Sequence, residues 1–215
     1  MGRLTLILGG ARSGKSTFAE RLASQNEARV AYIATAQAMD DEMTQRIAAH
    51  RSQRPESWLT LEIPAGVGQA LRSNPPEVDV IVLDCLTLLV SNLLLGVDAR
   101  PGERGESRSD GKDRSNDEDL SDSESSVSAD YSFDDERVAL AAIEQELDEL
   151  LEAICNSPAE WIVVSNEVGM GLVPPYPLGR VYRDLLGWAN QRLAGTADLV
   201  YFMIAGIPMR LAPES

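Results

Sequence analysis

Apolar residues gather in short continuous runs along most of the chain, and segments of helical period separate these runs. The expected strands are Leu4 to Leu8, Val30 to Ala34, Val78 to Asp84, Trp161 to Ser165 and Val200 to Ile204. The expected helices are Lys15 to Ser24, Asp40 to His50, Leu86 to Leu95, Asp135 to Ile154 and Leu178 to Leu193. Strands that are apolar throughout and alternate with helices predict an open α/β fold, in which helices cover both faces of a mostly parallel sheet.

One segment breaks this alternation. From Arg100 to Ser132 the chain is Ser, Asp, Glu, Arg and Gly with almost nothing apolar, and fourteen acids face five bases between Asp98 and Glu136. Such a composition buries too little surface to offset the entropy of ordering. We therefore expect a single domain over residues 1–215 with a disordered acidic insertion at about 98–134. A solvated surface loop is the simpler interpretation, and an acidic interaction or phosphorylation loop is the alternative.

Composition excludes several classes of protein. The formal net charge of -15 argues against nucleic acid or an anionic membrane as the main partner, because clustered Lys and Arg hold polyanions. No apolar run reaches the roughly 18 residues of a membrane span, and LTLILGGA leads into a charged glycine-rich loop rather than a cleavage site. We expect a cytoplasmic protein. Cys85 and Cys155 lie far apart in apolar contexts, which favours buried free thiols.

The strongest chemical signal is GGARSGKS, which runs from Gly9 to Ser16 between a predicted strand and a predicted helix. It satisfies GxxxxGK followed by Ser, the P-loop pattern, in which backbone N-H groups and a helix N-terminus surround phosphates. Lys15 is expected to reach the β and γ phosphates of ATP or GTP, and the Ser16 hydroxyl to ligate Mg2+. The fold is therefore expected to be P-loop NTPase-like. The predicted phosphate-binding residues are Gly9, Gly10, Ala11, Arg12, Ser13, Gly14, Lys15 and Ser16.

Asp84 gives this interpretation a second support. It ends an apolar strand, the position from which an acid beside a P-loop binds Mg2+ directly or through water. The alternative is a cap for the next helix. Ser16 and Asp84 are thus the two candidate metal ligands.

His50 is the single histidine of the chain. On a helix it follows Met43 and Ile47 at i, i+4 and i+7, so one interpretation is a partly buried residue that ends an apolar stripe. Arg51 and Arg54 follow it, however, and two cations there suit a phosphate chain. A neutral imidazole near the α-phosphate of a nucleotide is a competent nucleophile.

Four motifs in order resemble a known family. They are GGARSGKS, YIATAQAMDDEMTQRIAAHRSQRPESWLTLE from Tyr32 to Glu62, SNEVGMGLVP from Ser165 to Pro174, and ANQRLAGTAD from Ala189 to Asp198. They are similar to the bifunctional adenosylcobinamide kinase and adenosylcobinamide-phosphate guanylyltransferase of cobalamin biosynthesis. The resemblance covers nearly the whole chain except the acidic insertion. It implies phosphorylation of adenosylcobinamide by ATP or GTP, then transfer of GMP from GTP through a guanylyl-histidine, and it suggests a homotrimer.

The resemblance also implies roles for particular residues. His50 matches the guanylylated histidine, and Ala49 stands where relatives carry a second histidine, which leaves one candidate nucleophile. Asp84 stands where relatives often have Glu. Glu62 is expected to accept hydrogen bonds from guanine N1-H and the N2 amine, which adenine does not offer. The further positions that are expected to contact nucleotide are Ala34, Thr35, Ala36, Arg51, Ser52, Gln53, Arg54, Glu62 and Asp84.

Three questions stay open at the level of sequence. The segment from Asn166 to Pro177 is expected either to help form the corrinoid site or to be a rigid connector. ATP and GTP both suit a P-loop as phosphoryl donors. The competing functions are a regulatory GTPase, which would hydrolyse GTP without a covalent adduct, and a small-molecule kinase, which would need no histidine.

Overall fold

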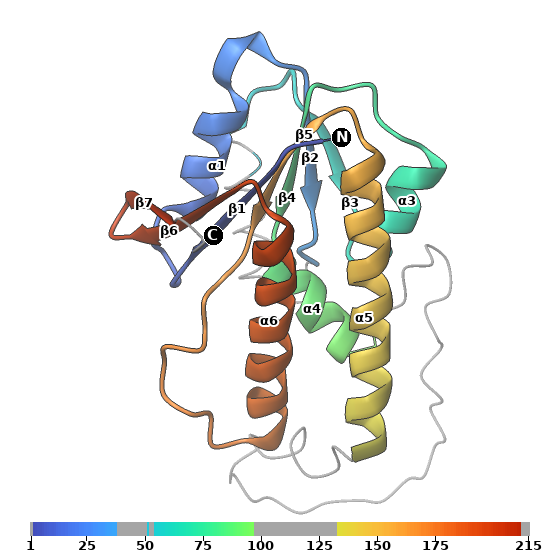
Figure 1. Ribbon diagram of the computed structural model, residues 1–215, viewed down its shortest axis with the longest axis vertical. Coiled ribbons are helices and arrows are strands. Elements are labelled where there is room, and N and C mark those ends of the chain that lie inside the picture. Colours follow the sequence, from blue (N-terminus) through green and yellow to red (C-terminus); the bar gives the residue numbers. More distant parts are fainter. Residues whose placement is uncertain (1, 38–50, 52–53, 97–132, 212–215) are drawn as a thin grey trace, which may run out of the picture.

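The computed structural model describes residues 2–37, 51, 54–96 and 133–211, and seven strands in these ranges form one sheet (Figure 1). The strand order is β3-β2-β4-β5-β1-β6-β7, with β1 to β6 parallel and β7 antiparallel to β6. The strands are β1 (Leu4–Gly9), β2 (Val30–Ala34), β3 (Leu59–Glu62), β4 (Val80–Asp84), β5 (Glu160–Val164), β6 (Leu199–Ile204) and β7 (Ile207–Leu211).

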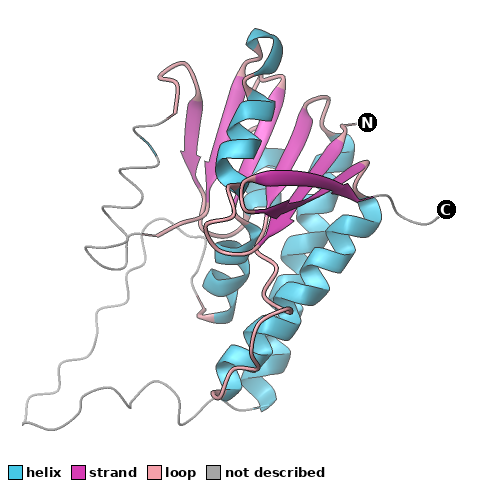
Figure 2. Cartoon of the chain, turned by 90° about the vertical axis from the view of Figure 1, so that its left-hand side faces the viewer, coloured by secondary structure: helices cyan, strands magenta, loops and turns pink. Residues whose placement is uncertain are grey.

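Helices cover both faces of this sheet. They are α1 (Lys15–Ala23), the 3-10 turn η1 (Gln25–Glu27), α3 (Val67–Ser73), α4 (Leu86–Leu94), α5 (Phe133–Asn156) and α6 (Pro177–Thr196). The long helices α5 and α6 run side by side on one face, and α1 lies on the other face (Figures 1 and 2). The predicted open α/β architecture is confirmed.

Two apolar clusters hold the layers together, because alternate residues of a strand point to opposite faces of the sheet. Leu4, Leu6 and Leu8 of β1 belong to the cluster that packs under α3, α4, α5 and α6. Ile7, between them, belongs to the cluster under α1, with Phe18 and Tyr32. All six residues of β1 are buried, as expected of a central parallel strand. The sheet therefore fixes the carboxyl ends of β1, β2 and β4 at one edge.

The five predicted strands and four of the five predicted helices are present, with ends that agree or differ by at most three residues. The helix predicted at 40–50 and the predicted acidic insertion, apart from its last residues at the start of α5, lie outside the described residues. The prediction missed β3, α3 and β7. Each carries a weak signal: β3 is half exposed, α3 has seven residues that include Gly68, and β7 is an exposed edge strand that contains Pro208.

Two smaller expectations concern the thiols and the membrane. Cys85 and Cys155 are free thiols, as predicted, although each residue is half-buried rather than fully enclosed. No helix in the described ranges combines the length and the apolar character that crossing a membrane requires.

Candidate functional site: a P-loop cavity at the carboxyl edge of the sheet

The loop between β1 and α1 has the backbone shape of a P-loop. Gly9 and Gly14 have φ values of 153° and 89°, and Arg12 also has a positive φ of 55°. A Cβ at Gly9 would lie 2.7 Å from the carbonyl oxygen of Met203, so the loop passes too close to β6 for a side chain. The turn after β6 supports the loop from the other side, because Gly206 N-H donates to the Ser13 carbonyl at 3.0 Å. The glycines therefore bend the chain toward the sheet and hold it there.

The N-terminus of α1 has no side-chain cap. Its first turn contains no acid, and the buried Ser13 hydroxyl has no hydrogen-bond partner within the described residues. The Lys15 ammonium lies folded over the loop and donates to the Gly10 carbonyl at 2.6 Å. Burial lowers the pKa of Lys15, while Cys85 and Asp84 act in the opposite direction. A cation beside the backbone N-H groups of a helix start forms an environment that stabilises a bound anion.

Asp84 lies across from this loop at the end of β4. Its partner in β2 is Ala34, and the Tyr32 hydroxyl donates to Asp84 Oδ2 at 2.5 Å. Burial and the neighbouring carboxylate raise the pKa of Tyr32 above its usual range, so the phenol stays a neutral donor. Burial, followed by the charge of Asp84, raises the pKa of Cys85 to about 12, which keeps this thiol protonated.

These elements enclose a cavity of about 380 Å³, within the size range of small-molecule sites. Four cationic side chains and two carboxylates line it, so the site is locally positive in a chain whose formal net charge is -15. The lining residues are Ala11, Arg12, Lys15, Ser16, Tyr32, Ala34, Ala36, Arg51, Arg54, Thr60, Glu62, Asp84, Cys85, Thr87, Leu88 and Asn166. The arrangement suits a phosphate chain bound between the P-loop and the ends of β2, β3 and β4.

Comparison with protein-family models decides what kind of P-loop protein this is. Residues 5–211 match CobU, described as cobinamide kinase / cobinamide phosphate guanyltransferase. The chain belongs to this family.

Curated relatives support the assignment over nearly their whole length. The chain is 41% identical to the bifunctional adenosylcobalamin biosynthesis protein CobP of Pseudomonas aeruginosa, over 97% of each chain. It is 37% identical to the bifunctional adenosylcobalamin biosynthesis protein CobU of Salmonella typhimurium and 36% identical to that of Escherichia coli, over 97% of this chain and 99% of each relative. The resemblance seen in the sequence motifs is thus confirmed as family membership.

Two of the three arginines that line this cavity, Arg51 and Arg54, differ in their surroundings. The side chain of Arg51 is 67% exposed, and its Nη1 lies 3.5 Å from Glu62 Oε1. The side chain of Arg54 is 8% exposed, its guanidinium lies 3.5 Å from the centroid of the Tyr32 ring, and its Nε lies 4.0 Å from Glu20 Oε1. Arg51 is thus an exposed cation that is paired with Glu62, whereas Arg54 is packed into the wall.

The structure brings together most of the nucleotide-binding residues predicted from sequence. Those on the cavity wall are Ala11, Arg12, Lys15, Ser16, Ala34, Ala36, Arg51, Arg54, Glu62 and Asp84, while Gly9, Gly10, Ser13 and Gly14 form the P-loop itself. Thr35 lies behind the wall, fully buried, where its Oγ1 donates to the Cys85 carbonyl at 2.7 Å and accepts from Cys85 N-H. His50, Ser52 and Gln53 lie outside the described residues.

Six further residues of the wall were not predicted as nucleotide contacts: Tyr32, Thr60, Cys85, Thr87, Leu88 and Asn166. The spacing in the strands gave a usable signal for two of them. Tyr32 lies two residues before Ala34 in β2, and Thr60 lies two residues before Glu62 in β3, so each pair shares a face of the sheet. The other four follow β4 or β5 at the same edge.

The segment after β5 is held in place by side chains of α6. Asn190 Nδ2 donates to the Asn166 carbonyl at 3.0 Å, and Arg183 Nη2 donates to the Gly169 carbonyl at 2.6 Å. Large apolar side chains nevertheless point away from the protein here: Met170, Leu172, Val173 and Tyr176 are 63 to 96% exposed. The segment is therefore a pinned loop with an apolar outer surface.

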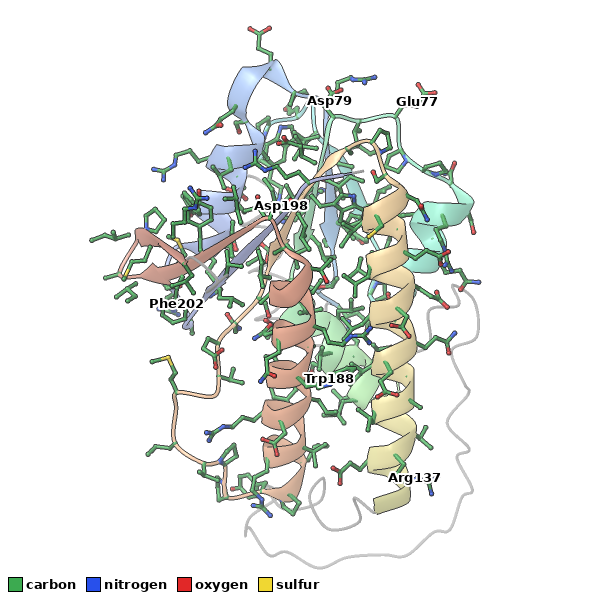
Figure 3. The ribbon with its side chains drawn as sticks, in the orientation of Figure 1. Glu77, Asp79, Arg137, Trp188, Asp198 and Phe202 are labelled. Atoms are coloured by element: carbon green, nitrogen blue, oxygen red, sulfur yellow. The ribbon has the colours of Figure 1, made fainter. Side chains whose placement is uncertain are left out.

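A larger cavity of about 610 Å³ lies at the amino ends of the strands, near Glu77 and Asp79 (Figure 3). Its wall contains Trp161, Arg29 and Arg72, but no part of the P-loop. Asp79 accepts hydrogen bonds from Arg29, and Arg72 pairs with Glu149 and Glu152. Acids pair with both of these cations, and the wall contains neither Lys15 nor the start of α1.

Proposed function

We propose that the protein phosphorylates adenosylcobinamide with ATP or GTP and then transfers GMP from GTP to adenosylcobinamide phosphate, with release of pyrophosphate. The observation that carries this proposal is the convergence of an uncapped P-loop helix, Lys15 and Asp84 on one cationic cavity. Membership of the cobinamide kinase / cobinamide phosphate guanyltransferase family supports the choice of reaction.

The kinase step is electrostatic in this proposal. A substrate hydroxyl attacks the γ-phosphorus, and the bond from that phosphorus to the β,γ-bridging oxygen breaks. We propose that Lys15, which lines the cavity, and the amides of the P-loop bind the β and γ phosphates and offset the negative charge that moves to the leaving group. Lys15 is thus a catalytic residue of this step as well as a nucleotide ligand.

The residues of the cavity fit a magnesium ion that is carried by the nucleotide. The Ser16 hydroxyl and the Asp84 carboxylate line the same wall, and oxygen ligands are those that Mg2+ prefers. No cluster of three or more acids, His or Cys that would hold a metal by themselves is found in the described part of the chain. Ser16 and Asp84 would hold the ion, which when bound would offset the charge of the phosphates.

The guanylyl-transfer step is covalent. We infer from the family match that a ring nitrogen of His50 attacks the α-phosphorus of GTP, so that a P-N bond forms while the P-O bond to pyrophosphate breaks. A phosphate oxygen of the corrinoid substrate then attacks the same phosphorus, the P-N bond breaks and His50 is regenerated. Arg51 is suited to the phosphates because it is exposed at the cavity, and Glu62 is suited to the guanine edge.

The remaining nucleotide contacts follow from the wall and from the family match. We propose that Gly9, Gly10, Ala11, Arg12, Ser13 and Gly14 bind through the loop, that Ala34, Thr35 and Ala36 shape the wall, and that Ser52, Gln53 and Arg54 complete the set.

The loop after β5 is our candidate for the corrinoid side of the site. Asn166 lines the nucleotide cavity, and the exposed apolar side chains from Met170 to Tyr176 continue from it. A corrin ring presents a large apolar surface, which such side chains would cover. A role as a plain connector would leave corrinoid affinity unchanged when Leu172, which is 96% exposed, is replaced by Ser.

The setting of the enzyme is also part of the proposal. We expect one catalytic domain, a homotrimer by analogy with the family, and a cytoplasmic location, where ATP and GTP are available. We propose no nucleic-acid partner, since a formal net charge of -15 opposes a polyanion.

The test is incubation of the protein with Mg2+ and GTP that is labelled at the α-phosphate, followed by denaturation and peptide mapping. We expect acid-labile, alkali-stable label on the peptide that contains His50. His50→Ala should lose the label and lower guanylyl transfer by about 10³-fold or more while phosphorylation remains. Unlabelled protein that hydrolyses GTP would support a regulatory GTPase, and unlabelled protein that phosphorylates adenosylcobinamide would support a kinase alone.

A further inference from the structure

Tyr32 is a buried residue whose hydroxyl donates a hydrogen bond to Asp84. It lies in the middle of β2, between apolar neighbours, and is 1% exposed. Its hydroxyl lies 2.5 Å from Asp84 Oδ2, a short distance that is typical of an O-H donor on an ionised carboxylate. Phe would pack in the same strand without the cost of burying a hydroxyl. Packing alone therefore does not explain why a tyrosine stands here.

The ring of Tyr32 is fixed from its faces. The guanidinium of Arg54 lies over it at 3.5 Å from the centroid. The ring of Trp58 lies 6.3 Å away, centroid to centroid, with its plane turned by 27°. A ring that is held by a cation and a second aromatic ring keeps its hydroxyl in one direction. The donor is thus aimed at Asp84 before any ligand binds.

The hydrogen bond fixes one oxygen of the carboxylate, Oδ2. The same carboxylate lines the cavity together with Lys15 and Ser16, so a fixed orientation of Asp84 sets how it meets a cation there. Partners of this kind orient metal-binding carboxylates in proteins, and their loss usually costs 10- to 100-fold in metal affinity or activity.

We propose that Tyr32 is a positioning residue, which orients Asp84 toward the magnesium ion of the bound nucleotide. The inference rests on the proposed metal role of Asp84 and adds a residue that sequence analysis did not single out. Arg54 and Trp58 contribute by holding the tyrosine ring.

The experiment measures binding, so it does not depend on turnover. The affinity of a non-hydrolysable GTP analogue is measured by calorimetry in excess EDTA and over a series of Mg2+ concentrations. We expect Mg2+ to tighten binding to the unmodified protein. Tyr32→Phe should raise by roughly 10-fold the Mg2+ concentration that gives half of this increase in affinity. The affinity for the GTP analogue in EDTA should stay unchanged. Asp84→Asn should lose at least as much of the response.

Tyr201→Phe is the matched control. Tyr201 is a half-buried tyrosine of β6, its ring meets Phe18 edge-on at 5.1 Å, and it does not line the cavity. The same substitution there should leave both affinities unchanged. A double variant separates positioning from stability: once Asp84→Asn is present, adding Tyr32→Phe should have no further effect on the Mg2+ response.

Each outcome decides. If Tyr32→Phe keeps the normal Mg2+ response while Asp84→Asn loses it, the inference is wrong and the proposed metal role stands. If Asp84→Asn also keeps the response, both the metal role and the inference are wrong. If Tyr32→Phe weakens binding equally in EDTA and in Mg2+, Tyr32 is a plain wall residue and the inference is again wrong.

Discussion

Two helices of this protein begin in the same way and meet opposite surroundings. Gly14 precedes α1 with a φ of 89°, and Gly66 precedes α3 with a φ of 70°. Both glycines have the left-handed backbone conformation, and neither helix has a side-chain cap at its N-cap residue. Each helix start therefore presents several backbone N-H groups without intrahelical partners.

At α3 a side chain of the protein supplies the hydrogen-bond acceptors. Glu146 of α5, which is 6% exposed, accepts hydrogen bonds from the backbone N-H groups of Gly66 at 2.6 Å, Val67 at 2.8 Å and Gly68 at 3.4 Å. At α1 the first helical residue is a cation, Lys15, which by itself opposes the partial positive charge of the helix start. The N-H groups at the start of α3 thus bond to the Glu146 side chain, which stabilises the fold. The start of α1 is suited to the phosphates of a substrate.

The largest expected effect is at α1. Lys15→Ala should lower both the kinase and the guanylyl-transfer rates by about 10²- to 10³-fold, because both reactions bind the triphosphate through this loop. The two rates are measured separately, with labelled γ- and α-phosphate. Arg21→Ala, an exposed cation of the same helix that lies 5.1 Å from the Phe18 ring, should change neither rate. Normal phosphorylation by Lys15→Ala would place the triphosphate elsewhere.

The corresponding change at α3 should affect stability instead. Glu146→Ala leaves three N-H groups without their acceptor in a buried site and should lower the free energy of unfolding by roughly 2–4 kcal/mol. Urea denaturation measures this loss, and the activity per folded molecule should stay normal. Glu144→Ala, an exposed acid of the same helix, should change stability by less than about 0.5 kcal/mol. Lost activity in folded Glu146→Ala would mean that the two helix starts are coupled.

The same contrast explains what the sequence predicted and what it missed. The P-loop was predictable because its glycines, Lys15 and Ser16 are contiguous and lie between two strongly patterned elements. The bonds from Glu146 to the start of α3 were not predictable, because Glu146 lies 80 residues from Gly66. In the sequence it is one of several charged residues on a helix. Tyr32 was hidden for a similar reason: its apolar strand predicts burial and gives no sign of the bond to Asp84.

The family match carries information that local pattern did not. The pattern around His50 left a core residue and a nucleophile as alternatives, and only the order of several motifs favoured the second. The strand pattern placed Asp84 correctly at the edge of the sheet, since Val80–Asp84 is apolar until its last residue. The roles of His50, Glu62 and Asp84 in binding nucleotide stay predictions.

A glycine substitution tests how tightly α3 must approach α5. A Cβ at Gly68 would lie 2.3 to 2.5 Å from the backbone of Glu149 and Leu150, so Gly68→Ala should push α3 away and cost about 1–3 kcal/mol of unfolding free energy. Gly187→Ala is the control, because nothing lies within 4 Å of its Cβ position in α6. Alanine there should raise stability by about 0.5–1 kcal/mol. Equal stabilisation by both changes would show that α3 is not held closely.

The smallest expected effect is the pH dependence at the start of α3. Burial raises the pKa of Glu146 more than its bonds to the N-H groups of Gly66, Gly68 and Val67 lower it. A carboxyl group whose pKa is higher in the folded than in the unfolded protein contributes most below its ordinary pKa of about 4.3. That contribution decreases as the pH rises through the raised value. The free energy of unfolding of the unmodified protein minus that of Glu146→Gln, measured in urea from acid to neutral pH, should therefore decrease with rising pH. An increase would mean that the three N-H groups outweigh burial, so that the start of α3 favours a charged carboxylate, as the P-loop is proposed to favour phosphate.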